Sequence, residues 1–77
     1  MSIARILSDM FDSQGLTPND VANMLNISVP IVWNSRSRGI SKMADLISYA
    51  SICGYKVYLY NEELNMKVEL TKEDFSD

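Results

Sequence analysis

The 77-residue chain predicts a mostly α-helical domain that ends in a small β element. Up to Gly54, apolar residues recur at spacings of three and four, which is typical of helices that bury one face. Beyond Gly54, apolar and polar residues alternate, which is typical of strands. We therefore expect one domain over 1–77, with a four-helix bundle over 1–54, a β-hairpin over 55–70 and an acidic tail over 71–77.

Length and composition limit what can stabilise this domain. A chain of this size buries only about 60% of the surface it exposes when unfolded, so a partner subunit is the favoured source of extra stability. Cys53 is the single cysteine and histidine is absent, which excludes an intramolecular disulfide and argues against a zinc site. No apolar run reaches the roughly 18 residues of a membrane helix, and the N-terminus does not resemble a signal peptide. We expect a cytoplasmic protein with no cofactor, no metal and no membrane contact.

The net charge of -3 is unevenly distributed. Residues 1–60 hold five basic and four acidic side chains, whereas residues 61–77 hold two basic and six acidic ones. Between Ser28 and Lys42 there are three bases and no acid. Positive potential is therefore expected in one short stretch of an otherwise acidic protein.

The first two helices have clear start signals. A helix over 2–13 is expected to begin at Ser2 and to end at the Gln14-Gly15 pair, with its apolar face formed by Ile3, Ile6, Leu7, Met10 and Phe11. Thr17, Pro18 and Asp20 predict the start of a second helix that runs to Leu25. Its expected inward residues are Val21, Ala22, Met24 and Leu25. Asn26 follows as a residue that tolerates positive φ in a tight turn.

The next two helices are less sharply marked. Ser28 is expected to cap a third helix that reaches Ser35 or Arg36, and the polar stretch 35–39 is interpreted as a loop. Ser41 is expected to cap a fourth helix, which stops at Gly54. The apolar face of that helix comprises Met43, Leu46, Ile47, Ala50 and Ile52.

The hairpin is predicted from alternation on either side of a turn at 61–65. Tyr55, Val57 and Leu59 face one side of the first strand, and Lys56, Tyr58 and Tyr60 face the other. Met66, Val68 and Leu70 mark the second strand. The tail over 71–77 is expected to be frayed, with Phe75 as the one residue able to dock.

Residues 16–39, LTPNDVANMLNISVPIVWNSRSRG, resemble the helix-turn-helix of the lambda-repressor and Cro-like superfamily, also called XRE-type regulators. The positions that carry the resemblance are Leu16, Thr17, Ala22, Leu25, Ile27, Ser28 and Val32. It extends over most of the chain, from the first helix to Tyr55, and residues 46–57 look like the exit of small phage and mobile-element regulators. A small residue such as Ala22 lets two helices cross closely at the corner of such a motif.

The resemblance implies a homodimeric transcriptional regulator, a repressor or an activator, that binds double-stranded DNA at a palindromic operator, with the third helix in the major groove. Carried over by position, the groove-facing residues are Ser28, Val29, Pro30, Trp33 and Asn34. Asn34 would read adenine, while Val29 and Pro30 would touch thymine methyl groups. Arg36, Arg38 and Lys42 would lie beside phosphates, and Thr17 and Ser41 would present helix N-termini to them.

The chain departs from the family pattern in ways that leave a second function open. The family usually has glutamine at Pro18 and glycine at Asn26, and polar residues at Val29 and Pro30. Hydrogen-bonded base readout would therefore be sparse, so that either DNA shape supplies specificity or the surface binds protein. The alternative is a protein-interaction module, an inhibitor or antirepressor, that uses Val29, Ile31 and Trp33 as an apolar surface. Trp33 is equally consistent with a core position.

The hairpin is the predicted dimerisation element. Its expected interface residues are Tyr55, Val57, Tyr58, Tyr60, Met66 and Val68, with the shared face of Tyr58 and Tyr60 as a seam. The four tyrosines are also consistent with simple packing, and Cys53 is expected to be a buried small hydrophobe. Because carboxylates gather only in the tail and no nucleophile-base pair is evident, we do not expect an enzyme.

Overall fold

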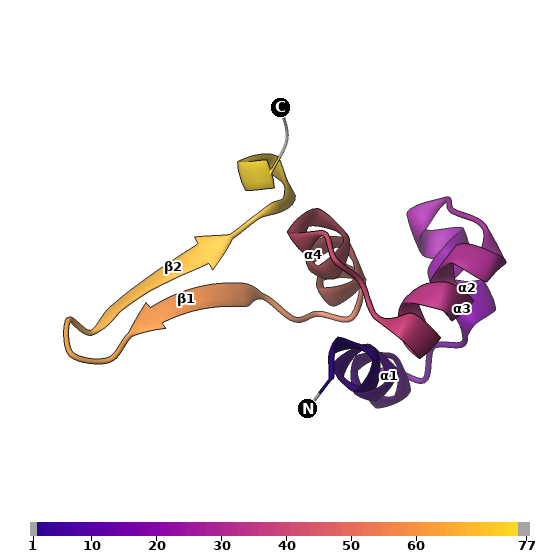
Figure 1. Ribbon diagram of the computed structural model, residues 1–77, viewed down its shortest axis with the longest axis horizontal. Helices are drawn as coiled ribbons and strands as arrows, with labels where there is room; N and C mark the ends of the chain where they lie inside the picture. Colours follow the sequence, from indigo (N-terminus) through magenta and orange to yellow (C-terminus); the bar gives the residue numbers. More distant parts are fainter. Residues whose placement is uncertain (1, 76–77) are drawn as a thin grey trace.

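In the part of the chain that the structure describes, four α-helices are followed by a projecting hairpin and a short 3-10 helix (Figure 1). The computed structural model describes residues 2–75. The elements, in chain order, are α1 (Ile3–Ser13), α2 (Pro18–Leu25), α3 (Val29–Arg38), α4 (Met43–Ile52), β1 (Val57–Asn61), β2 (Met66–Leu70) and the 3-10 helix η1 (Lys72–Phe75). The predicted fold class, mostly helical with a small β element, is confirmed.

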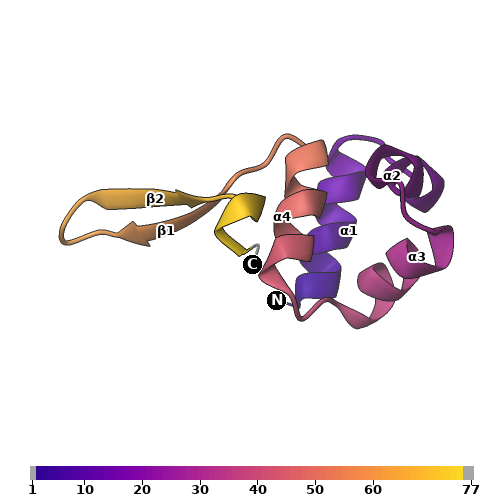
Figure 2. The ribbon, with the colours of Figure 1, turned by 90° about the horizontal axis from the view of Figure 1, so that it is seen from above.

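The helices form one body and the hairpin extends away from it. Figure 2 shows α1 and α4 side by side, with α2 and α3 lying beyond α1. In both views the hairpin leaves the body on the side opposite α2 and α3 (Figures 1 and 2). The surface of α3 and the surface of the hairpin are therefore separate.

The core lies where α1 meets the other three helices. Phe11, Leu7, Val21 and Val32 are its largest fully buried side chains. The rings of Phe11 and Tyr49 meet edge to face, with centroids 5.6 Å apart. Such aromatic pairs stabilise by about 0.5–1.5 kcal/mol beyond the area they bury.

A buried hydrogen-bond chain anchors α3 to α4. Ser35 Oγ donates to the Ile31 carbonyl at 3.0 Å, and the Tyr49 hydroxyl lies 2.8 Å from the same Ser35 oxygen. Among the described residues, no buried side-chain nitrogen or oxygen lacks a hydrogen-bond partner. Ser35 therefore satisfies its own helix and the tyrosine together, and this fixes the inner face of α3.

Local signals place the starts of α1 and α2 as predicted. Ser2 Oγ accepts from the Arg5 N–H at 3.2 Å. In α2 the two partners cap each other: Thr17 Oγ1 accepts from the Asp20 N–H, and Asp20 Oδ2 accepts from the Thr17 N–H. This capping box satisfies two backbone donors that a helix start otherwise leaves free. Asn26 has φ 56°, which confirms the left-handed residue that turns the chain from α2 into α3.

The capping box makes stability depend on pH. Hydrogen bonds from Thr17, first from its backbone and then from its side chain, lower the pKa of Asp20 below the ordinary 3.8. The ionised carboxylate therefore stabilises the fold above pH 3.8, and this contribution is lost as the pH falls through the lowered pKa. We expect Asp20→Asn to lower Tm at neutral pH and to lower it less in strong acid. An equal loss of Tm at both pH values would contradict this cause.

The predicted end of the third helix was wrong. We predicted a loop over 35–39, but α3 continues through Arg38, and Gly39 with φ 86° ends it. The reason is that contacts with other helices hold this stretch in place: Ser35 is bound by the Tyr49 hydroxyl, and Arg36 donates to Ser8. The hydroxyls of Ser35 and Ser37 are bound within the helix, to the carbonyls of Ile31 and Trp33.

One predicted cap and two inward residues were also wrong. Ser28 is the N-cap of α3 as predicted, although its side chain makes no cap bond, whereas Lys42, not Ser41, is the N-cap of α4. Met24 and Met43 are exposed. The body meets α2 along Val21 and Ala22, and Met24 lies beyond the edge of that contact.

The hairpin turns within the predicted segment 61–65, and its two strands pair antiparallel. Val57 pairs with Leu70, Leu59 with Val68 and Asn61 with Met66. Asn65 has φ 49°, and Asn61 Oδ1 accepts from the Leu64 N–H at 3.0 Å. Paired residues share a face, so one face of the sheet is apolar, with Val57, Leu59, Met66, Val68 and Leu70.

The segments that flank the hairpin differ from expectation. Tyr55 precedes the strand: its N–H donates to the Ala50 carbonyl, and its hydroxyl donates to Ser13 Oγ. The tail is not frayed over 71–75 but forms η1, which packs beside α4 and is capped where Asp74 Oδ2 accepts from the Thr71 N–H at 2.7 Å. Phe75 is exposed and does not dock. Residues 76–77 lie outside the described residues.

Candidate nucleic-acid interface

The outward side of α3 is uncovered. Its inner residues Val32 and Ser35 are buried, whereas Pro30, Trp33 and Asn34 are exposed. Trp33 is 53% exposed, so the interpretation of this residue as part of the core is wrong. A rigid helix therefore presents an aromatic ring and a carboxamide to the outside.

Not every predicted groove residue joins this surface. Ser28, Pro30, Trp33 and Asn34 lie on the exposed part of α3. Val29 is half-buried and packs against the core, so its side chain is not available as predicted for a thymine contact or for an apolar partner surface.

Thr17 does not offer the predicted phosphate site at the start of α2. Its backbone N–H is bound to the Asp20 carboxylate at 2.9 Å, and its hydroxyl oxygen accepts from the Asp20 N–H. A second anion at this helix start would meet the negative charge of Asp20. We therefore no longer expect Thr17 to contact phosphate through its backbone. Ser41 fails for a different reason, because it is not the cap of α4.

Arg36 is directed toward α1 and is not free for phosphate. Its Nε donates to Ser8 Oγ at 3.1 Å, and its Nη2 lies 3.8 Å from Asp12 Oδ1. Its guanidinium carbon also lies 5.8 Å from the Trp33 ring centroid. Arg36 therefore ties α3 to α1 and supports the exposed indole, while Asp12 offsets part of its charge.

Arg38 and Lys42 are the available cations of this surface. Both are exposed, and neither makes an ion pair with any of residues 2–75. Arg38 ends α3 and Lys42 begins α4, so they flank the Gly39 turn. Because no acid lies between Ser28 and Lys42, their charges are not offset by neighbours in this segment.

Sequence reasoning missed Met24 as part of the apolar surface, because it placed this residue on the inward face of the second helix. Met24 is about half exposed, as Ile31 and Trp33 are. Ile31 and Trp33 belong to the apolar surface that the alternative function uses, and their exposure agrees with that placement.

The hairpin residues predicted as one dimer seam fall on different sides. Tyr58 and Tyr60 share one face, where Lys67 Nζ lies 5.3 Å and 5.8 Å from their ring centroids. Val57, Met66 and Val68 lie on the opposite face. Tyr55 is outside the strand and bound to α1. Leu59 was left out of the predicted interface, although alternation along the strand places it on the same face as Val57.

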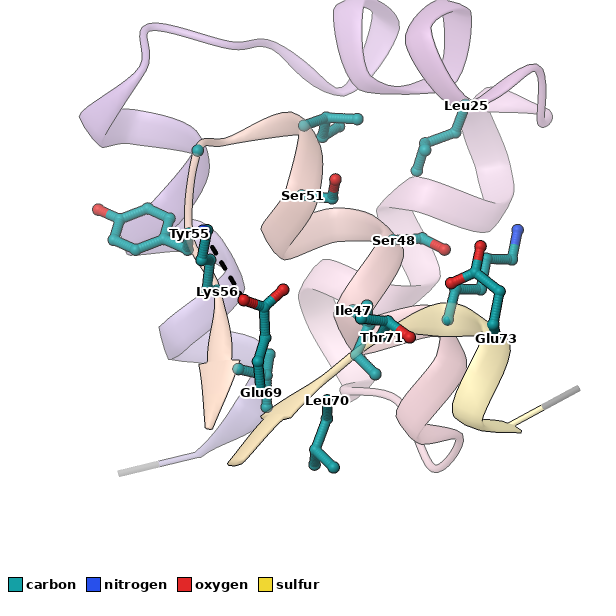
Figure 3. A pocket seen from close by; sticks show the side chains of 14 residues that line it. Leu25, Ile47, Ser48, Ser51, Tyr55, Lys56, Glu69, Leu70, Thr71 and Glu73 are labelled. Carbon is teal, nitrogen blue, oxygen red and sulfur yellow. Dashed lines mark ion pairs between the residues drawn. The ribbon is translucent and has the colours of Figure 1, made fainter. Parts of the chain in front are cut away.

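A hollow of about 520 Å³ is lined by residues of α4, of the base of the hairpin and of η1 (Figure 3). The Lys56–Glu69 ion pair, 3.7 Å long, crosses one side of it. The hydroxyl of Ser48 donates to the Ala44 carbonyl, and no buried side-chain nitrogen or oxygen of the described residues is left without a partner. Nothing in its lining therefore indicates a specific ligand.

The remaining chemistry is sparse in the part of the chain that the structure describes. Burial raises the pKa of the Cys53 thiol, which keeps it protonated and poorly nucleophilic. Residues 2–75 contain no group of three His, Cys, Asp or Glu side chains placed to hold a metal ion. None of the described helices has the length and apolarity needed to cross a membrane.

Comparison with known proteins identifies no relative of this chain. No family model, curated protein or solved structure matches the chain. The resemblance of residues 16–39 to lambda-repressor and Cro-like regulators therefore rests on the sequence itself and stays a prediction.

Proposed function

We propose that this protein is a cytoplasmic, DNA-binding transcriptional regulator that acts as a homodimer, with α3 in the major groove of its operator. One observation carries the proposal: α3 is anchored on one side by Val32 and Ser35 and uncovered on the other, next to the unpaired charge of Arg38 and Lys42. A firmly held helix with an uncovered face beside positive charge is what major-groove docking requires.

The corner between α2 and α3 supports this geometry. Ala22 is buried, and its carbonyl accepts from the Ile27 N–H at 3.0 Å, across the left-handed Asn26. A small side chain and a closed turn let the two helices approach closely and hold a fixed angle, as in helix-turn-helix motifs. The angle of α3 is thus set by local structure.

The chemistry of the exposed face suggests mixed readout. Asn34 is the one side chain there that can bind adenine through two hydrogen bonds. Trp33 and Pro30 offer apolar contact with thymine methyl groups, while Arg38 and Lys42 neutralise phosphates. With so few hydrogen-bonding groups, much of the specificity would come from DNA shape.

The test is a fluorescence-anisotropy titration of the full chain with the duplex upstream of its own coding region, at several salt concentrations. We expect affinity to fall steeply between about 50 mM and about 200 mM salt. Arg38→Ala should flatten the log-log slope by about one for each subunit bound. Arg36→Ala should flatten it less, because Ser8 and Asp12 already bind that side chain.

Two results would contradict DNA binding. One is the absence of binding at low salt, and the other is equal affinity for the upstream duplex and for a scrambled duplex of the same length. The first result would favour a protein-interaction module, an inhibitor or antirepressor. The half-exposed side chains of Met24, Ile31 and Trp33 support that second candidate, because apolar and aromatic residues are typical of interface cores.

A further inference from the structure

We propose that a second copy of this chain docks on the outer edge of β2, antiparallel and centred on Val68, so that two hairpins form one four-stranded sheet. This inference rests on the homodimer of the proposed function and specifies its interface. It depends on the free edge of β2 and on the order of charges along that strand.

The edge of β2 is open. The sheet has two strands, and β2 is paired with β1 alone. Figures 1 and 2 show the hairpin projecting clear of the four helices. Val68 is 50% exposed and Met66 is 56% exposed. An open edge presents unpaired N–H and C=O groups to any matching strand, and an isolated two-stranded hairpin is only marginally stable in water.

The order of residues along β2 is self-complementary. Pairing centred on Val68 sets Lys67 opposite Glu69 of the partner subunit, and Glu69 opposite Lys67 of the partner subunit. Met66 then lies opposite Leu70 of the partner subunit, and Val68 opposite its own copy. Every opposing pair is thus either oppositely charged or apolar on both sides, which is the favourable arrangement for cross-strand neighbours.

Other registers of β2 lose this match. A two-fold pairing centred on Lys67 or on Glu69 sets like charges directly opposite each other at the centre. A pairing shifted by one residue sets Lys67 opposite Val68 and turns the apolar face of one hairpin onto the charged face of the other. Among pairings centred on Lys67, Val68 or Glu69, charge and face therefore favour the one centred on Val68.

The edge of β1 is a poorer site. A pairing centred on Leu59 would set Lys56 opposite Glu62 of the partner subunit, but it would also set the apolar Val57 opposite the polar Asn61. The base of β1 also borders α1, because Val57 and Tyr58 line the same hollow as Ile6 and Met10. Over Met66 to Val68, β2 lines neither of the two hollows beside the helices, and only Glu69 and Leu70 at its base line the hollow beside α4.

Contacts within the hairpin hold the two charges in position. Lys67 lies over the rings of Tyr58 and Tyr60, and Glu69 pairs with Lys56 at 3.7 Å. Both side chains therefore stay on the tyrosine face, where the partner strand would place their opposite charges. The ordering of these side chains is partly complete before association, which lowers its entropic cost.

The test is sedimentation equilibrium of the full chain without DNA, at micromolar concentrations. The wild-type protein should be a dimer. Lys67→Glu alone and Glu69→Lys alone each create two like-charge pairs across the interface, and each should raise the dimer dissociation constant by about tenfold or more. An equimolar mixture of these two single variants restores opposite charges at every pair, so it should dimerise more tightly than either variant alone.

The mixture is the decisive sample, because any interaction that a substitution breaks within its own hairpin stays broken in the mixture. Lys56→Glu is the matched control: it reverses a charge and breaks the pair that holds Glu69, but no cross-copy pair of this register involves it. The dimer should therefore persist, with a much smaller rise in its dissociation constant than Lys67→Glu or Glu69→Lys produces. Circular dichroism checks that each variant is folded. Three results would overturn the proposal. One is a monomeric wild type, and another is a mixture that dimerises no more tightly than either variant alone. The third is dissociation by Lys56→Glu alone, which would assign the contact between copies to β1.

The outcome is separable from that of the DNA titration. If the chain dimerises with this charge pattern but binds no DNA, the strand pairing is supported and the proposed DNA-binding function is contradicted. If the chain binds the upstream duplex but stays monomeric without DNA, the strand pairing is contradicted.

Discussion

Phe11→Ala is expected to remove most of the stability of the fold. Phe11 is fully buried and packs edge to face on Tyr49, and Phe-to-Ala changes in protein cores typically cost about 3–5 kcal/mol. Total stabilities run at roughly 0.05–0.15 kcal/mol per residue, so this 77-residue chain has about 4–12 kcal/mol to lose. Urea denaturation followed by circular dichroism should show a large fall in the midpoint, or a variant unfolded in buffer.

Phe75→Ala provides the matched control. The same side chain is removed, but Phe75 lies on η1 and is 44% exposed, so the free energy of unfolding should change by about 0.5 kcal/mol or less. Both variants should be compared at one protein concentration, because association would add to the stability of the folded chain. Equal midpoints for Phe11→Ala and the wild type would show that Phe11 is not at the centre of the core.

The second large effect is expected on DNA affinity. Arg38→Glu combined with Lys42→Glu replaces both exposed, unpaired cations beside α3 by acids, and these acids would repel the phosphates that the cations attract. We expect the affinity for the upstream duplex at low salt to fall at least about 100-fold, with the salt dependence largely abolished. Anisotropy titrations at matched salt measure both quantities.

The control for net charge is Lys56→Glu combined with Lys72→Glu. It changes the charge by the same amount, but at the base of the hairpin and on η1. If α3 and its flanks bind the DNA, this control should lose much less affinity than the variant at Arg38 and Lys42. Equal losses would mean that total charge, and not the surface of α3, governs binding.

The start of α2 was predictable because its causes are local. Thr17, Pro18 and Asp20 act on backbone groups within three residues, and Asn26 relieves the strain of a left-handed turn at its own position. The strands were predictable for a similar reason, because alternation follows directly from the pleat of a strand. Such signals need no knowledge of the rest of the fold.

The errors arose where distant residues decide the outcome. Ser35 is buried because Tyr49, 14 positions later, binds it, and Arg36 is withdrawn from solvent by Ser8, 28 positions earlier. No periodicity reveals either contact, so α3 was predicted too short and Arg36 was assigned to phosphate. Trp33 is exposed because no element covers that side of α3, which a single sequence does not disclose.

For the candidate site, the exposure of most residues was predicted correctly, and the surroundings of three residues were not. The exposed positions of Ser28, Pro30, Trp33, Asn34, Arg38 and Lys42 agree with their predicted placement. The other three predicted residues make contacts within the protein: Val29 packs against the core, Thr17 caps α2 together with Asp20, and Arg36 binds Ser8 and Asp12. For the hairpin, alternation separates Tyr58 and Tyr60 from Met66 and Val68, and the predicted interface merged these two faces.

The hairpin contributes little to the hydrophobic core, since of its ten strand residues Val57 alone packs against the buried cluster. Substitutions at its turn, or a change in the length of its arms, would leave the four helices intact. If two subunits pair through the hairpin, as we propose, folding and self-association depend on different stretches of the same short polypeptide. Mutations in the hairpin can then change which subunits pair, and how far apart they lie, without unfolding the helical body of each subunit.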